Sequence, residues 1–363
     1  MTDVTAGPVI RPPSAQTGVI AWLRQNLFST WYNCLLTFLA LYVIVMGGKG
    51  LIEWAFANAV FVGTFEDCRK ATGACWAVVG EKRHFMLFGT YPFEEAWRPA
   101  VATALFIVML LASTWRRLWG RPLLIAWVVA FVVMGVLMRG GILGLRPVTT
   151  ESWGGLPLTL MLSGIGIIAA FPLGLILALG RRSHMPIIKA LSVAFIELVR
   201  GVPLISVLFM ASVMFPLFLP EGVTIDKLLR AQVGIILFAA AYIAEAVRGG
   251  LQAVPKGQFE AADALGLSYW QSMRLIILPQ ALRIVIPPLV GIFIGMFKDT
   301  SLVLIIGLYD LLNAVRTSVN DPNWRAYSIE AYVFAAAIFF VFCYFMSKYS
   351  QYLERLLAAG RNR

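Results

Sequence analysis

Charged residues are scarce in this sequence, because Asp, Glu, Lys and Arg make up only 13% of its 363 residues. Soluble domains carry roughly 25%, so the composition excludes an ordinary soluble globular protein. Hydrophobic residues account for 60% of the chain instead. The formal net charge is +11, but we find no RNA- or DNA-binding signature. The composition therefore argues against a nucleic-acid partner.

Histidine and cysteine are also rare, with two and four residues. His84 and His184 stand alone, no Cys/His cluster has the spacing of a zinc site, and no nucleophile–base constellation indicates an enzyme. The phosphate-binding pattern G-x-x-x-x-G-K-[ST] is absent as well. If ATP drives this protein, the ATPase has to be a separate subunit.

Long apolar runs are what the sequence has in place of charge. Several are long enough to cross a hydrocarbon core of ~30 Å as helices, and a spanning helix satisfies its own backbone hydrogen bonds. We expect an all-α polytopic membrane protein with about eight transmembrane helices. The expected spans are Asn33–Gly48, Ala100–Thr114, Leu123–Met138, Leu156–Leu179, Val193–Leu219, Ala231–Val247, Ile284–Leu308 and Ala331–Tyr349. The segment 51–63 is either interfacial or an extension of the first span.

The orientation follows from Lys and Arg, which favour the cytoplasmic side. They gather at 115–121, at 181–189 and in the tail after Lys348, so both termini are predicted to be cytoplasmic. Residues 1–30 read as a tail and not as a cleavable signal peptide. The loop 49–98 then lies outside, where Cys68 and Cys75 could form a disulfide in an oxidising compartment. Two free thiols are the alternative.

The stretch QFEAADALGLSYWQSMRLIILPQ, residues 258–280, is polar and has helical patterning in this hydrophobic chain. Gly266 is placed to end a first short helix in a left-handed cap. Ser268 and Gln271 have capping-box spacing for a second helix, and Pro279 is expected to stop it. The sequence predicts a helix–turn–helix on the cytoplasmic surface. The alternative is an amphipathic connector that lies on the lipid headgroups.

The residue pattern of this stretch has a known counterpart. It contains the string Glu260-Ala261-Ala262, then Gly266 after three residues, Ile276 after nine more, and Leu278-Pro279 after one more. This string resembles the signature loop of the membrane subunits of bacterial ABC importers. The resemblance implies that the loop 251–283 docks in a groove of a separate ATPase subunit. ATP and magnesium would be bound there, and no cofactor is expected in this chain.

Further stretches narrow the resemblance. Residues 195–205, 241–268 and 297–312 resemble permeases of the polar-amino-acid (histidine, glutamate, glutamine) family. This implies a five-helix type I permease core at 151–350, followed by a cytoplasmic tail at 351–363. The extension 31–150, with about three spans and a periplasmic loop, resembles the long general L-amino-acid (glutamate/glutamine/aspartate/asparagine) permeases.

The implied partners are an ABC ATPase, a second, homologous permease subunit in a heterodimer, a periplasmic amino-acid-binding protein and membrane lipid. The alternative function is an ion-coupled secondary amino acid transporter. Such carriers often have repeated halves and paired helix breaks, and neither is evident in the sequence.

Ionisable groups inside spans are costly and face the protein interior or a wet path. Lys298 and Asp299, with Thr300 and Ser301, either line the translocation path for a zwitterionic amino acid or neutralise charges elsewhere in the bundle. Gly291, Gly295 and Asp299 share a helix face on which small residues would allow another helix to approach.

Glu197 and Arg200 are three residues apart, a spacing that permits a pair on one helix. The resemblance places this stretch near the cytoplasmic gate, where a structural pair is favoured over substrate contact. Gly201 and Pro203 are expected to bend or break the helix there. Glu245 and Arg248 flank the entrance to the coupling loop. Ala261 and Ala262 are small where a partner groove would need close contact.

Overall fold

The computed structural model describes residues 18–359, so residues 1–17 and 360–363 of the two predicted tails lie outside the described residues. The chain divides into two compact units, Met1–Ala77 and Val78–Arg363. This division lies inside the predicted extension 31–150, because α5 (Trp97–Ala112) packs against both α6 (Arg121–Arg139) and α7 (Gly155–Arg181). Two of the three spans expected in the extension thus belong to the second unit.

The first unit contains α1 (Val19–Asn26), α2 (Trp31–Ile52) and α3 (Phe65–Lys70). A π-helical turn, Glu53–Ala57, continues α2, so the start of the ambiguous segment 51–63 extends the span. No residue of α2 is buried in the described structure. Its apolar surface therefore suits a lipid environment.

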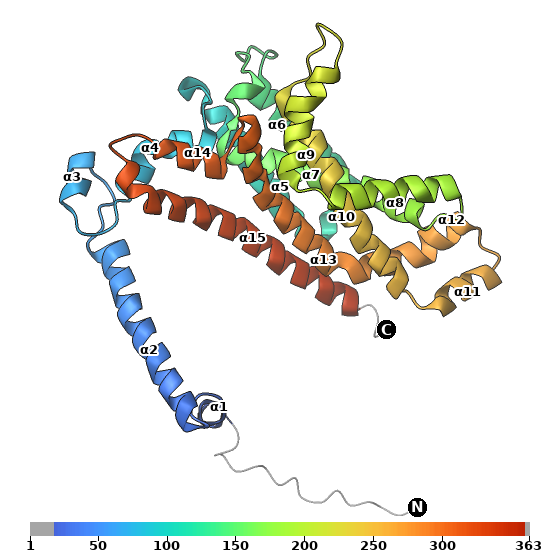
Figure 1. Ribbon diagram of the computed structural model, residues 1–363, viewed down its shortest axis with the longest axis horizontal. Coiled ribbons are helices and arrows are strands. Elements are labelled where there is room, and N and C mark those ends of the chain that lie inside the picture. The colour runs from blue at the N-terminus through green and yellow to red at the C-terminus, as the bar shows by residue number, and fades with distance from the viewer. Residues whose placement is uncertain (1–17, 360–363) are drawn as a thin grey trace, which may run out of the picture. The chain divides into compact units, whose positions relative to one another are not determined.

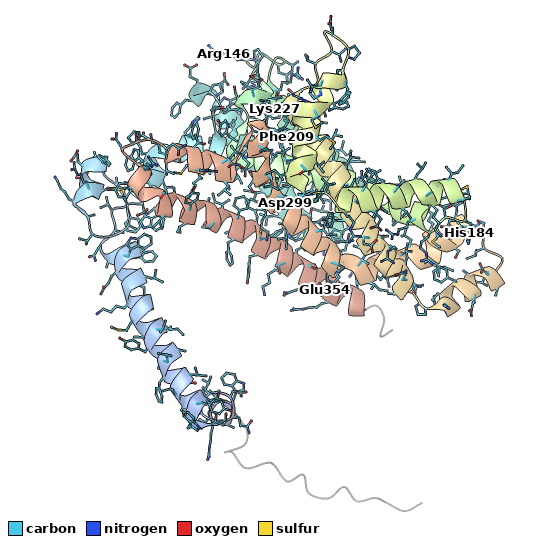
Figure 2. The ribbon with its side chains drawn as sticks, viewed as in Figure 1. Arg146, His184, Phe209, Lys227, Asp299 and Glu354 are labelled. Atoms are coloured by element: carbon cyan, nitrogen blue, oxygen red, sulfur yellow. A yellow bond between two sulfur atoms is a disulfide. The ribbon has the colours of Figure 1, made fainter. Side chains whose placement is uncertain are left out.

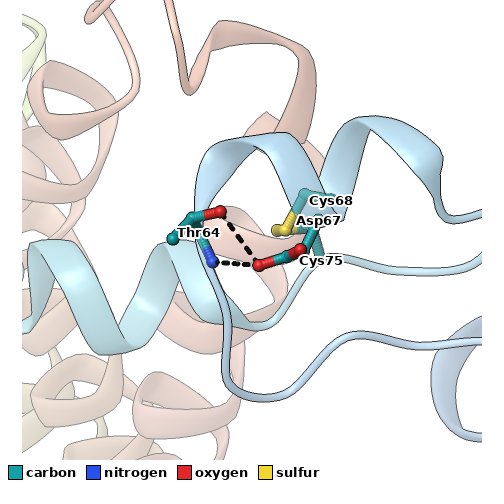
Figure 3. The surroundings of a disulfide bond; sticks show 4 residues. All are labelled: Thr64, Asp67, Cys68 and Cys75. Carbon is teal, nitrogen blue, oxygen red and sulfur yellow. Dashed lines mark hydrogen bonds between the residues drawn. A yellow bond between two sulfur atoms is a disulfide. The ribbon is translucent and has the colours of Figure 1, made fainter.

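Cys68 and Cys75 form a disulfide with a Cα–Cα separation of 5.5 Å, and both residues are buried. Figure 3 shows this bond beside the start of α3, where Thr64 and Asp67 form a capping box. The Thr64 backbone N–H donates to Asp67 Oδ2 at 2.8 Å. This hydrogen bond and that of the Thr64 hydroxyl lower the pKa of Asp67. The expected outside loop 49–98 is thus largely folded.

The second unit is a bundle of helices joined by short 3-10 and π-helical turns (Figure 1). Besides α5, α6 and α7, its named elements are α4 (Ala77–Phe88), α8 (Pro186–Arg200), α9 (Leu204–Phe209), α10 (Lys227–Ala253), α11 (Lys256–Ala264), α12 (Tyr269–Ser272), α13 (Leu278–Asp299), β1 (Tyr309–Asp310), α14 (Leu311–Ser318) and α15 (Ser328–Ala359).

Seven helical segments of the described chain are long and apolar enough to cross a membrane, and a bent pair makes up to eight. The bent pair covers the predicted span Val193–Leu219: α8 and the segment Leu204–Phe218 meet at 104°. Gly201 is the C-cap of α8 and Pro203 the N-cap of α9. Proline disfavours helical backbone at the residue before it, which explains the break. The predicted bend is confirmed.

The centre of the second unit is a row of closely packed helices, in which α10 contacts both α7 and α13, and α13 contacts α15 (Figure 1). Glycines permit this approach. A Cβ on Gly174 of α7 would lie 2.6 Å from Ile243 of α10, and one on Gly250 of α10 would lie 2.4 Å from Val285 of α13. Small residues at helix contacts are the usual device in membranes, where packing drives helix association.

The start of α7 is hydrogen-bonded to the segment after α13 through β-bridges. Gly154 and Gly155 form parallel bridges with Tyr309 and Asp310. Asp310 is fully buried and caps α14, since its carboxylate accepts from the backbone N–H groups of Leu312 at 3.2 Å and Asn313 at 3.1 Å. Burial raises the pKa of Asp310 to about 6, against these hydrogen bonds, which lower it.

Candidate coupling and translocation sites

The predicted coupling segment begins with α11, which ends in a left-handed turn at Gly266, with φ of +70°. The Gly266 N–H donates to Asp263 O at 2.9 Å and the Leu267 N–H to Ala262 O at 3.2 Å. These two bonds define a Schellman motif. Ser268 and Gln271 form the expected capping box at α12. The local signals in the sequence therefore placed both ends of the turn correctly.

The second half of the segment differs from the prediction. Pro279 does not stop the helix: α12 passes through the π-helical turn Met273–Ile277 directly into α13. Pro279 lies in the first turn of α13, where a missing N–H is tolerated. The second half of the coupling segment, from Tyr269, and the span that begins at α13 thus form one continuous helical segment, Tyr269–Ile306.

The signature residues fall into exposed and inward-facing groups. Glu260, Ala261, Gly266 and Pro279 are exposed, whereas Ile276 and Leu278 are half-buried. Ala262 is fully buried, so the prediction that it offers close contact to a partner is wrong. α11 packs against the π-helical turn Met273–Ile277, and a close-packed contact of this kind favours a small side chain.

Large apolar side chains at the tip of the segment were not recognised from the sequence. Leu265, Trp270 and Leu275 are 73%, 68% and 65% exposed, and Tyr269 is also exposed. Met273 and Ile277 follow Trp270 at helical spacing, but both are buried. α11 and α12 protrude together at one end of the second unit (Figure 1). Large apolar side chains that are exposed together on one protruding segment indicate an interaction surface.

A network of charged side chains joins the ends of α7, α8 and α10. Glu245 Oε2 accepts a hydrogen bond from Arg248 Nε at 2.9 Å. The same oxygen lies 3.4 Å from Arg181 Nη1 and 3.7 Å from Arg200 Nη1. Arg181 also contacts Glu197 at 2.7 Å. We name these five residues the gate network.

The predicted pair between Glu197 and Arg200 does not form in the described structure. Each residue binds a different helix instead, Glu197 through Arg181 of α7 and Arg200 through Glu245 of α10. Ion pairs between helices stabilise a particular arrangement of those helices, whereas a pair on one helix would not. Arg200 also lies over the ring of Tyr242, 5.6 Å from its centroid.

Tyr242 connects the gate network to a cavity of about 290 Å³. Asp299 and Gly295 line this cavity, together with apolar side chains that include Leu204 and Met296. In Figure 2, Asp299 lies part-way along the bundle, far from His184 at the end where α11 protrudes. The volume is near the lower end of the roughly 300–1,000 Å³ seen for ligand pockets, which suits a small solute.

The other predicted path residues do not share this position. Lys298 is exposed, and neither Lys298 nor Asp299 has an ion pair within the described part of the chain. Thr300 is buried and its hydroxyl donates to Phe297 O at 2.8 Å, while the Ser301 carbonyl accepts from Asn313 at 2.7 Å. Only Asp299 of this group lines the cavity.

No other helix of the described structure packs on the predicted small-residue face. A Cβ on Gly291 or Gly295 would meet no atom within 4 Å. The expected approach of another helix is therefore not made by the described part of this chain. Gly295 instead leaves room in the cavity beside Asp299.

Comparison with known proteins gives the class of this molecule. The family described as "binding-protein-dependent transport system inner membrane component" matches residues 170–358, and the chain belongs to this family. It is therefore a membrane-spanning permease subunit of a transport system and not an enzyme. Such systems in general include an ATPase and a substrate-binding protein. The ion-coupled carrier finds no support in the comparisons.

Individual relatives extend the likeness over the whole chain. The inner membrane amino-acid ABC transporter permease protein YhdY of Escherichia coli is 51% identical and is aligned over 99% of both chains. The glutamate/glutamine/aspartate/asparagine transport system permease protein BztC of Rhodobacter capsulatus is 40% identical over 95% of both. A crystal structure of an amino acid ABC transporter with histidines is 33% identical, with a TM-score of 0.50, over 55% of this chain and 91% of that one.

Proposed function

We propose that this chain is the permease subunit of an ATP-driven importer of polar L-amino acids, of the glutamate, glutamine, aspartate and asparagine class. The observation that carries the proposal is the exposed coupling segment, which projects from the bundle and continues directly into the helix that bears Asp299. The substrate class is supported by the relatives, which align with nearly the full length of this chain.

The geometry suggests how transport would be driven. The exposed face of α11, with Glu260 and Ala261, and the apolar tip around Leu265 would dock on the ATPase subunit. Because α12, the π-helical turn and α13 are continuous, a displacement of this tip moves α13 as well. The gate network holds the ends of α7, α8 and α10 together next to the cavity. Opening of that network would release the solute.

The remaining parts of the system follow from this role. ATP and magnesium would be bound by the ATPase subunit, with no cofactor in this chain. A homologous second permease would complete a heterodimer, and a periplasmic amino-acid-binding protein would deliver the substrate. The chain would lie in the bacterial inner membrane with both termini in the cytoplasm.

Uptake by the reconstituted complex tests this function. Proteoliposomes that contain the two permeases and the ATPase should take up labelled glutamine or glutamate only with ATP and the binding protein. Gly295→Leu should fill the cavity and strongly reduce uptake. The matched control is Gly135→Leu in α6, since Gly135 is equally open but does not line the cavity. Uptake driven by an ion gradient without the ATPase would overturn the proposal.

The path residues can be separated in the same assay. Asp299→Asn keeps the shape of the side chain and removes its charge, so uptake should fall if the carboxylate contacts the substrate. Lys298→Ala should leave uptake unchanged, because Lys298 does not line the cavity. If uptake instead fell in Lys298→Ala and was unchanged in Asp299→Asn, Asp299 would not be part of the translocation path.

A further inference from the structure

The C-terminal end of α7 carries two consecutive arginines with different partners. Neighbouring residues on a helix point about 100° apart, so their side chains diverge. Arg181 enters the gate network through Glu197 and Glu245. Arg182, the C-cap residue of α7, takes no part in that network and reaches α10 and α11 instead.

Arg182 makes two contacts. Its Nη1 donates to Leu251 O at 3.0 Å, in the last turn of α10. The last carbonyls of a helix have no partner within the helix, and a cation is favoured at that end. The guanidinium also lies over the ring of Phe259 in α11, with Cζ 5.5 Å from the ring centroid, which is within the range of a cation–π interaction.

These contacts cross a gap between α11 and the bundle. A cavity of about 450 Å³ separates α11 from the ends of α7 and α10, and its lining includes Arg182, Leu251 and Phe259. α11 packs instead on the π-helical turn Met273–Ile277. The Arg182 side chain is thus a bridge from α7 to the helix that carries Glu260 and Ala261.

We propose that Arg182 is a positioning residue for transport, which passes a displacement of α11 to α7 and, through its neighbour Arg181, to the gate network. The inference rests on the proposed docking of α11 on an ATPase. Phe259 directly precedes Glu260, so a shift of the docked face moves the ring on which Arg182 lies. The end of α7 then moves together with the ion pairs that Arg181 makes.

The test is a double-mutant cycle in the assembled complex with Arg182→Ala and Phe259→Leu, where leucine keeps an apolar side chain but removes the ring. The readouts are ATPase association in a pull-down, hydrolysis without binding protein, and hydrolysis stimulated by the loaded binding protein. Lys189→Ala serves as the charge control, because Lys189 is an exposed lysine of α8. Arg182→Lys keeps the charge and loses the planar stack.

We expect each single variant to bind the ATPase normally, with stimulation reduced about two- to fivefold, the range of an exposed cation–π contact. The double variant should be no worse than Arg182→Ala, and Arg182→Lys should be intermediate. Wild-type stimulation in Arg182→Ala, or effects that multiply in the double variant, would overturn the proposal. Failure of the wild-type chain to bind an ATPase would instead overturn the proposed function on which it rests.

Discussion

Replacing Gly266 with valine should weaken both stimulated ATP hydrolysis and uptake without removing the protein from the membrane. Gly266 has a φ of +70° at the end of α11, a left-handed conformation that costs an L-residue about 1–2 kcal/mol. An added Cβ would meet no atom within 4 Å, so the penalty comes from the backbone alone. The Schellman bonds from Gly266 and Leu267 would break if the turn relaxed.

The size of the effect follows from this penalty. A penalty of about 1–2 kcal/mol shifts a conformational equilibrium by a factor of about 5–30, so the native turn becomes less populated by up to this factor. Gly266→Asn is the matched control, since asparagine tolerates the left-handed region better than other side chains. We expect hydrolysis stimulated by the loaded binding protein, and uptake, to fall about fivefold or more in the valine variant and much less in the asparagine variant.

The assay combines membrane abundance, a pull-down of the ATPase subunit, and stimulated hydrolysis in proteoliposomes. The spans lie outside the turn and should insert normally. Wild-type coupling and undiminished ATPase association in Gly266→Val would show that the turn is not part of the coupling element.

Three further predictions concern other parts of the structure. Glu245→Gln removes the carboxylate shared by Arg181, Arg200 and Arg248 and should lower the free energy of unfolding by about 1–3 kcal/mol, measured by thermal unfolding in detergent. Glu197→Gln, at a more exposed residue with one arginine partner, should cost less, and equal effects would contradict the central place of Glu245. Asp310 has a pKa raised to about 6 from 3.8, so its carboxyl group binds a proton more tightly in the folded state than in the unfolded state. Ionisation of Asp310 therefore destabilises the folded protein as the pH rises through 6. Asp310→Asn should therefore be more stable than wild type at pH 7.5, by up to about 3 kcal/mol, with the advantage lost near pH 4, whereas a pH-independent difference would refute the linkage. Cys68 and Cys75 should react with maleimide in intact cells only after reduction, and ready labelling without reductant would argue against the disulfide in the cell.

Features set by nearby residues were predictable from the sequence. The apolar runs gave the spans because a helix in lipid satisfies its own hydrogen bonds. Gly266 and the Ser268–Gln271 box marked the turn because their signals act within a few residues. The bend between α8 and α9 followed from Gly201 and Pro203 for the same reason.

Features that depend on packing between distant segments were not predictable. Glu197 contacts Arg181, sixteen residues away, rather than Arg200 on its own helix. Ala262 is buried because α11 folds back on the turn before α13. The helix propensity of alanine does not reveal such a contact. Pro279 failed as a stop signal because the π-helical turn before it places it in the first turn of α13.

The most direct test of the coupling segment is site-specific crosslinking to the ATPase subunit. Leu265→Cys places a thiol at the exposed tip beside Gly266, and Ile142→Cys places one in the predicted outside loop, where it is also exposed. We predict that a short bifunctional thiol reagent joins Leu265→Cys to the ATPase in membranes and leaves Ile142→Cys uncrosslinked. Crosslinking at Ile142→Cys, with none at Leu265→Cys, would contradict the account.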